Sequence, residues 1–229
     1  MIADKLARVH QRIASACEAA HRPVRSVTLL AVSKTFGADA VRQAEAAGQH
    51  RFGENYVQEG LDKIVVLADL RERIEWHLIG PLQSNKTRAV AAHFDWVQSI
   101  DRLKIAERLS AQRPAHLAPL SVCIQVNISG EASKSGVAPA ELAALAQAVA
   151  ALPRLRLRGL MAVPETAGDF AAQRAPHSAL HALFTALQRD GLALDTLSAG
   201  MSGDLEAAID AGATLVRVGS AIFGDRVAG

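Results

Sequence analysis

The most regular feature of the chain is a repeated change from a short apolar run to a longer amphipathic segment. The apolar runs are mostly continuous rather than alternating, which is typical of strands covered on both faces, as in parallel sheets. The strands expected from this pattern are residues 27–32, 50–53, 75–79, 95–99, 120–127, 155–162, 194–198 and 214–218. The helices expected between them are residues 38–48, 55–69, 84–91, 101–112, 139–151, 168–190 and 203–211, with residues 1–21 as an extra helix in front and a short helix at the end.

Eight strands, each followed by a helix, predict an α/β fold with a parallel sheet and right-handed crossovers. Eight such units in 229 residues favour a closed (β/α)8 barrel of the TIM type with an extra N-terminal helix. An open dinucleotide-binding sheet would more often carry a glycine-rich fingerprint after its first strand, and that motif is absent from the sequence. The connections are short, so we expect one domain over residues 1–229.

Composition and charge exclude several partners. The chain is 50% hydrophobic, enough for a sizeable core, and its 25 basic and 23 acidic residues form no basic stripe for nucleic acid. The start of the chain has no signal-peptide shape, and the longest apolar stretch, residues 142–152, is too short to span a membrane. We therefore expect a cytoplasmic protein in which Cys17 and Cys123 are buried thiols.

One lysine stands out by its position. Barrel sites lie at the carboxyl ends of the strands, and of the six lysines only Lys34 sits at the end of an apolar strand. Partial desolvation there would lower the pKa of the ammonium group and favour the nucleophilic amine. That chemistry suits a Schiff base with a carbonyl compound, although a solvated lysine at a strand end is the alternative for this residue alone.

Small and hydroxyl-bearing residues follow the last two expected strands, at residues 197–204 and 217–220. Barrels often bind phosphate after strands seven and eight, where backbone amides can approach an anion, although ordinary turns would have the same composition. A reactive lysine together with a phosphate site predicts pyridoxal 5′-phosphate (PLP), which carries an aldehyde and a phosphate. A sugar-phosphate enzyme without a cofactor is the alternative.

Other candidates carry weaker signals. His77 lies within the strand at 75–79 and is a candidate for contact with the cofactor, with a buried core histidine as the alternative. His177 and His181 are four residues apart, but without a third ligand they are expected to be surface residues, so no metal site is predicted. The polar loop Ser133-Lys134-Ser135-Gly136 is expected to be a solvated loop, with contact to an anion as the alternative.

Seven ordered motifs carry a resemblance to a known family. They are Ala31-Val-Ser-Lys34-Thr, Phe52-Gly-Glu-Asn55-Tyr-Val-Gln-Glu59, Trp76-His-Leu-Ile-Gly-Pro-Leu-Gln-Ser-Asn-Lys86, Val126-Asn-Ile-Ser with Ser133-Lys-Ser-Gly136, Arg158-Gly-Leu-Met-Ala162, Met201-Ser-Gly-Asp-Leu-Glu-Ala-Ala-Ile209 and Val216-Arg-Val-Gly-Ser-Ala-Ile-Phe-Gly224. Over nearly its whole length the chain resembles the pyridoxal phosphate homeostasis proteins, the YggS/PROSC family.

The resemblance implies a barrel like the N-terminal domain of alanine racemase, with PLP attached to Lys34. It implies that Asn55 lies beside the cofactor ring and that Arg217 faces the pyridine nitrogen. It also implies phosphate contacts from a set of small or loop residues. These residues are Ser198, Met201, Ser202, Gly219 and Ser220.

Arg217 bears on whether such a protein is an enzyme. A guanidinium can only donate to the pyridine nitrogen, which discourages ring protonation and makes the ring a poorer electron sink. Racemisation further needs an acid/base group on the opposite face, which alanine racemases take from a tyrosine of an additional domain. The chain ends at Gly229 after the barrel, and its only tyrosine, Tyr56, adjoins Asn55.

We therefore expect a monomeric, non-enzymatic protein of intracellular PLP homeostasis that buffers or delivers the cofactor. A PLP-dependent amino-acid racemase of narrow scope is the alternative. Whether particular apo-enzymes receive the cofactor is left open by the sequence.

Overall fold

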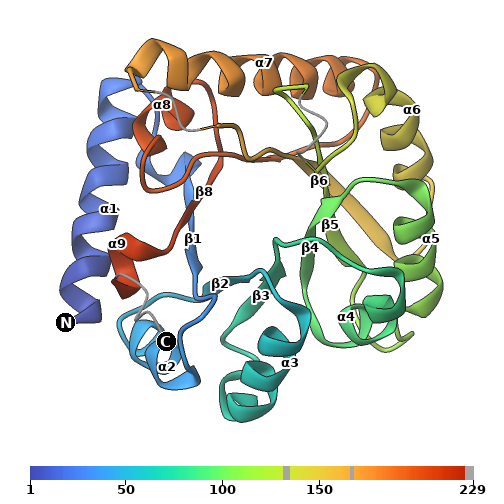
Figure 1. Cartoon of the computed structure of the whole chain (residues 1–229), viewed down its shortest axis with the longest axis horizontal. Coiled ribbons are helices and arrows are strands. Elements are labelled where there is room, and N and C mark those ends of the chain that lie inside the picture. The colour runs from blue at the N-terminus through green and yellow to red at the C-terminus, as the bar shows by residue number, and fades with distance from the viewer. Residues whose placement is uncertain (131–134, 166–167, 225–229) are drawn as a thin grey trace.

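Eight parallel strands close into a barrel in the order in which they occur along the chain (Figure 1). This arrangement is seen in a computed structural model, which describes residues 1–130, 135–165 and 168–224. The strands are β1 (Thr28–Val32), β2 (Arg51–Glu54), β3 (Glu75–Leu78), β4 (Trp96–Ile100), β5 (Leu120–Gln125), β6 (Leu155–Met161), β7 (Thr196–Ser198) and β8 (Leu215–Val218). The predicted (β/α)8 barrel is confirmed, since β1 pairs with both β2 and β8.

Helices surround the barrel, and the predicted extra helix packs outside its closing strands. The helices are α1 (Ile2–Ala19), α2 (Ala38–Ala46), α3 (Val57–Val66), α4 (Thr87–His93), α5 (Leu103–Gln112), α6 (Pro139–Ala150), α7 (Phe170–Arg189), α8 (Leu205–Asp210) and α9 (Ser220–Phe223). α1 runs beside α8 and α9 (Figure 1) and buries Leu6, Val9 and Ile13, which recur at helical spacing.

Two of the predicted helices are each divided into an α-helix and a separate 3-10 turn. The expected helix at 55–69 is α3 followed by a separate 3-10 turn at 68–70, and the one at 84–91 begins with a 3-10 turn at 84–86 before α4. Tighter 3-10 turns are common at helix ends and as connectors, and apolar spacing alone does not distinguish them from an α-helix.

The apolar core has two unequal parts. The larger part lies between the strands and the helices, and a separate small cluster consists of Trp96, Cys123 and Met161. Both cysteines are buried free thiols, as predicted. In the described residues no helix is long and apolar enough to cross a membrane.

The alternation of side chains along the strands divides the barrel interior into layers. Two residues four positions apart on a strand point the same way, into the barrel. In each such pair the earlier residue lines a cavity at the amino ends of the strands, and the later residue lines a cavity at the carboxyl ends. These pairs are Thr28 and Val32, Arg51 and Asn55, Glu75 and Ile79, and Leu215 and Gly219. The positions midway between them are Leu30, Gly53, His77 and Arg217, which place one histidine and one arginine at mid-height in the barrel.

Candidate functional site

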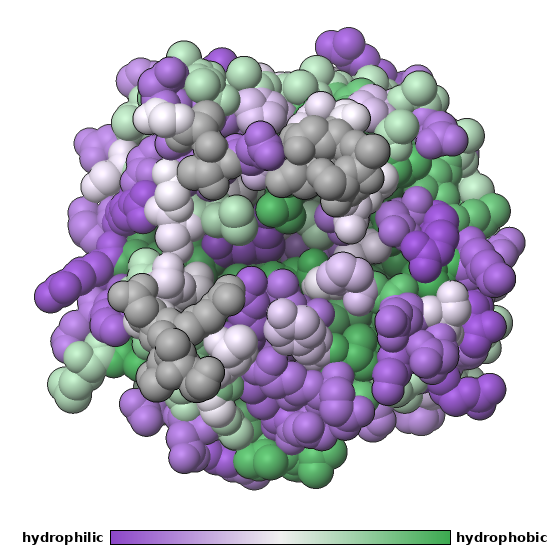
Figure 2. Space-filling model, viewed as in Figure 1, coloured by the Kyte–Doolittle hydropathy of each residue, from purple (hydrophilic) through white to green (hydrophobic). Residues whose placement is uncertain are grey.

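A cavity of about 430 Å³ lies at the carboxyl ends of the strands and gathers most of the predicted site residues. Figure 2 shows a central hollow bordered by both hydrophilic and hydrophobic residues. The predicted residues that line the cavity are Lys34, Asn55, Met201, Ser202, Arg217, Gly219 and Ser220. Among its described lining residues there is no Asp or Glu, so Lys34 and Arg217 make the cavity suitable for an anion.

The turn that carries Lys34 is held in an unusual backbone conformation. Lys34 lies two residues beyond the end of β1, and Thr35 after it has a φ of 69°, which is costly for a β-branched residue. The amide of Thr35 donates to Glu59 Oε1 at 2.5 Å, and Lys63 Nζ donates to the carbonyl oxygen of Ser33 at 2.7 Å. The turn is therefore fixed from both sides of Lys34.

A buried charge cluster lies beneath this turn. Lys63 is only 5% exposed and donates to Glu54 and Glu59 at 2.7 Å each, while the Ser33 hydroxyl donates to Glu54 at 2.6 Å. Burial raises the pKa of Glu54, and the adjacent Lys63 opposes that rise. Lys63 falls within the helix expected at 55–69 and was not among the candidate site residues, although the four-residue spacing of Glu59 and Lys63 is a signal for such a pair.

Asn55 has a polar atom that the protein leaves without a partner. Its Oδ1 is buried and accepts no hydrogen bond from the part of the chain that the structure describes. The backbone of Asn55 is also closely packed, because a Cβ on Gly80 would lie 2.0 Å from the Asn55 carbonyl oxygen. An unsatisfied acceptor at a cavity wall is a place where a ligand's donor fits.

The loop of Met201 and Ser202 is held by hydrogen bonds to the largely buried Asp204. Asp204 accepts from the Met201 amide at 2.7 Å and from His177 Nε2 at 2.8 Å. Burial would raise the pKa of Asp204, but its bonds to His177 and Met201 hold the pKa below the ordinary value. The expectation of two surface histidines is thus wrong for His177, which α7 buries against this loop, and right for His181, which is exposed.

Arg217 supplies a buried cation beneath the cavity. Its guanidinium donates to the Ser198 hydroxyl at 2.7 Å and to the Ala162 carbonyl oxygen at 2.8 Å. Burial lowers the pKa of Arg217 to about 10, while Asp204 and Cys123 act in the opposite direction. The group is still charged at neutral pH.

Two predicted site residues do not line the cavity. His77 is fully buried deeper in the barrel, stacked on Trp96 with ring centres 5.0 Å apart. Ser198 is also fully buried, and its hydroxyl lies between Arg217 and Gln98. Of the polar loop 133–136, Ser133 and Lys134 lie outside the described residues.

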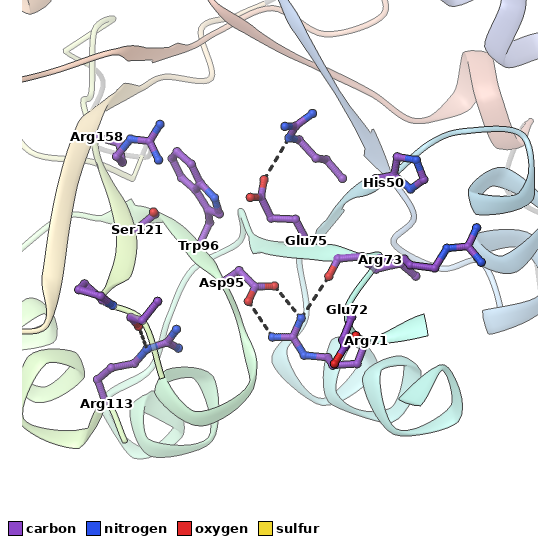
Figure 3. A pocket seen from close by; sticks show the side chains of 14 residues that line it. His50, Arg71, Glu72, Arg73, Glu75, Asp95, Trp96, Arg113, Ser121 and Arg158 are labelled. Carbon is purple, nitrogen blue, oxygen red and sulfur yellow. Dashed lines mark hydrogen bonds and ion pairs between the residues drawn. The ribbon is translucent and has the colours of Figure 1, made fainter. Parts of the chain in front are cut away.

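Another cavity, of about 470 Å³, lies at the opposite end of the barrel (Figure 3). It shares Arg51 and Glu75 with the amino-end cavity described above. Five arginines line it, but each is paired within the protein. Arg51 pairs with Glu75, Arg71 with Asp95, Arg73 with Glu45 and Arg158 with Asp195, and Arg113 donates to the carbonyl oxygens of Ala91, Phe94 and Ala118. These ion pairs and hydrogen bonds give each of the five arginines a structural role. The described residues contain no cluster of three or more potential metal ligands.

Fold and site together define a (β/α)8 barrel with a cavity at the carboxyl ends of its strands, where one lysine and one arginine are among the described lining residues. The family model described as "Alanine racemase, N-terminal domain" matches residues 5–227. The pyridoxal phosphate homeostasis protein of Pseudomonas aeruginosa is 61% identical over 225 residues, which cover 98% of this chain and 96% of that protein. Its counterpart in Escherichia coli is 55% identical over 226 residues, 98% of this chain and 97% of that one.

A solved structure is similar over the same range. PipY of Synechococcus elongatus, determined with PLP bound, superposes with a TM-score of 0.85 at 37% identity, covering 98% of this chain and 100% of PipY. The chain belongs to the family of pyridoxal phosphate homeostasis proteins.

Proposed function

We propose that the chain is a PLP-binding protein of intracellular PLP homeostasis, which holds the cofactor on Lys34 and buffers or delivers it. The observation that carries this proposal is the cavity at the carboxyl ends of the strands, with Lys34, the unsatisfied Asn55 acceptor and Arg217 on its wall. The relatives named for PLP homeostasis and the PLP-bound PipY structure support it. Residues 1–229 would act as one cofactor-binding domain of a cytoplasmic monomer.

The residues present suit the parts of PLP. Ser202, Gly219 and Ser220 supply hydroxyls and small side chains for a phosphate, as barrels do after their last two strands. The amine of Lys34 would attack the aldehyde carbon, so that a C=N bond replaces the C=O bond and the oxygen leaves as water. Arg217 would donate to the pyridine nitrogen and keep it unprotonated. His77 and Ser198 have no direct contact with the cofactor in this proposal.

The same residues argue against efficient turnover. When bound, PLP supplies an electron sink, and an unprotonated ring nitrogen weakens that sink. Racemisation also needs an acid/base group opposite Lys34. Tyr56 is 60% exposed and does not line the cavity, so it is poorly placed for that role.

Titration of the purified protein with PLP, followed by its absorbance, tests the binding proposal. We expect a Schiff-base band in the wild type and in Lys104→Ala, a control that removes an exposed helical lysine, and none in Lys34→Ala. A wild type that forms no such band, or a Lys34→Ala variant that forms it fully, would overturn the proposal.

Chiral analysis tests the racemase alternative separately. The PLP-loaded protein is incubated with L-amino acids and the D-enantiomers are measured, with Lys34→Ala as the control. We expect no D-amino acid beyond that control. Rapid production that depends on Lys34 would make the protein a racemase.

A further inference from the structure

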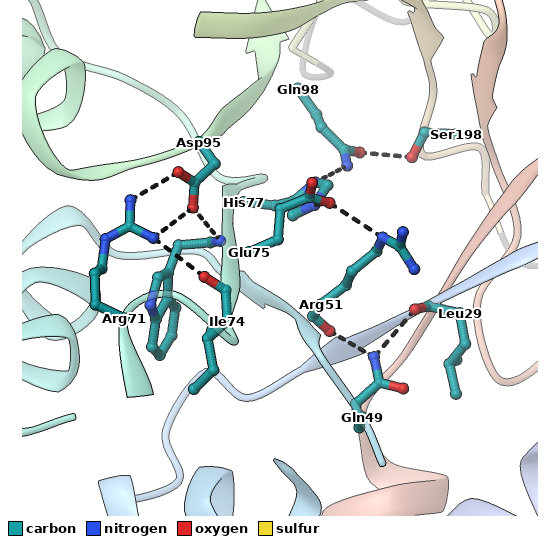
Figure 4. Close-up of polar contacts among 11 residues, drawn as sticks. Leu29, Gln49, Arg51, Arg71, Ile74, Glu75, His77, Asp95, Gln98 and Ser198 are labelled. Atoms are coloured by element: carbon teal, nitrogen blue, oxygen red, sulfur yellow. Dashed lines mark hydrogen bonds and ion pairs between the residues drawn. The ribbon is translucent and has the colours of Figure 1, made fainter. Parts of the chain in front are cut away.

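A chain of hydrogen bonds crosses the barrel interior from Arg217, at the cavity near the carboxyl ends of the strands, to Glu75 at the opposite end. Figure 4 shows the part of this chain from Ser198 to Glu75. Arg217 Nη1 donates to the Ser198 hydroxyl at 2.7 Å, which donates to Gln98 Oε1 at 2.6 Å. Gln98 Nε2 lies 2.9 Å from His77 Nδ1, and His77 Nε2 lies 2.8 Å from Glu75 Oε1. Residues from β8, β7, β4 and β3 therefore form one continuous chain.

The direction of every bond in this chain follows from its ends. A guanidinium can only donate, so Ser198 accepts from Arg217 and is left to donate its own proton to the Gln98 oxygen. The Gln98 amide nitrogen must then donate to His77 Nδ1, which leaves the proton of a neutral imidazole on Nε2, directed at the Glu75 carboxylate. All donors point from the cation to the anion.

The surroundings of His77 agree with a neutral ring. His77 is fully buried and stacks on Trp96, and the Arg158 guanidinium lies over the Trp96 ring, 4.6 Å from its centre. Burial lowers the pKa of His77, while Glu75 and Asp95 act to raise it and Arg51 to lower it. A neutral histidine can accept at one nitrogen and donate at the other, whereas a protonated one cannot accept at all.

We propose that Gln98 and His77 are positioning residues, which act through Ser198 to hold the Arg217 guanidinium in place beneath the cavity. Rotation of the guanidinium away from Ser198 would leave the buried Ser198 hydroxyl without its donor, whereas the bonds from Ser198 to Glu75 keep that hydroxyl in place as the acceptor for Arg217. Bonds aligned in this way strengthen one another in a buried setting. The effect on the cofactor rests on the function proposed above, but the arrangement of the protein groups does not.

The wild type without PLP provides the first test and needs no variant. Nitrogen-15 NMR of the His77 ring distinguishes its tautomers. We expect a neutral ring with the proton on Nε2 and a bare, hydrogen-bonded Nδ1. A proton on Nδ1 at neutral pH would reverse the chain and overturn the proposal.

A pair of variants provides the second test. Gln98→Met removes both bonds of Gln98, and Gln49→Met is the matched control, because Gln49 is another buried glutamine that makes two bonds, to the carbonyl oxygens of Leu29 and Arg51. The readout is the side-chain nitrogen NMR of Arg217 without PLP. We expect restricted guanidinium rotation in the wild type and in Gln49→Met, and freer rotation in Gln98→Met.

PLP affinity and absorbance extend the test to the cofactor. We expect Gln98→Met to bind PLP about tenfold more weakly, equal to about 1.4 kcal/mol, and to shift the absorbance of the bound form. Gln49→Met should match the wild type in both. If the wild type binds PLP and the two variants bind it equally well, the positioning role of Gln98 is wrong. If the wild type binds no PLP, the proposed function is wrong, and the NMR comparison without PLP still decides the role of Gln98.

Discussion

Removal of the buried Lys63 ammonium should destabilise the protein far more than removal of an exposed lysine. In Lys63→Met the Glu54 carboxylate, which is 0% exposed, loses its 2.7 Å ion pair and keeps only the Ser33 hydroxyl as a partner. Removing one member of a buried ion pair costs about 3–5 kcal/mol. We therefore expect that loss in the free energy of unfolding at neutral pH, measured by urea denaturation.

The pH dependence of this loss identifies its cause. Burial already raises the pKa of Glu54 above its ordinary 4.5, and without Lys63 the pKa rises further. The unfolded state keeps the ordinary value, so at neutral pH folding then requires either an unpaired buried carboxylate or uptake of a proton. The deficit of Lys63→Met should consequently shrink as the pH falls toward about 4.5.

Two variants serve as controls for this reasoning. Lys104→Met, on the exposed face of α5, should change the free energy of unfolding by no more than about 0.5 kcal/mol. Lys63→Met/Glu54→Gln removes the charge from both partners and should recover much of the loss. A Lys63→Met variant as stable as Lys104→Met, or a deficit that does not change with pH, would refute the role given to the cluster.

Three further predictions concern other parts of the structure. Gly80→Ala should weaken PLP binding about tenfold, measured by absorbance titration, because its Cβ would meet the Asn55 carbonyl oxygen at 2.0 Å; unchanged affinity would contradict the close packing. Cys123, whose pKa burial raises to about 12, should not react with a thiol reagent in the native protein but should react after denaturation. The lowered pKa of Asp204 should contribute stability above its ordinary 3.8 that is lost as the pH falls through the folded value. Unfolding free energies between pH of about 5 and 3 should therefore fall less in Asp204→Asn than in the wild type, and equal slopes would argue against this contribution.

The barrel and the residues at its carboxyl end were predictable because both follow from local sequence. Continuous apolar runs indicate strands buried on both faces, and a polar residue at the carboxyl end of such a run, as with Lys34, lies at the edge where barrels carry their sites. The cavity brings Lys34 together with Arg217, as expected, although 183 positions separate them (217 − 34).

The interior contacts were not predictable because they depend on closure of the barrel. Gln98 and Ser198 are 100 positions apart and meet because closure of the barrel brings the non-adjacent strands β4 and β7 around one interior. His177 looked like one of two surface histidines, yet the rotation of α7 buries it against Asp204. His77 and Ser198 are polar residues buried in the barrel interior. Their positions along the sequence do not show whether they line the cavity or lie deeper than it.

The most direct test of the central claim is to locate the attachment of PLP. Borohydride reduction of the loaded protein fixes a Schiff base as a stable amine, and peptide mass spectrometry then identifies the modified lysine. We expect the modification on Lys34. A reduced adduct confined to a different lysine, or none at all, would contradict the account.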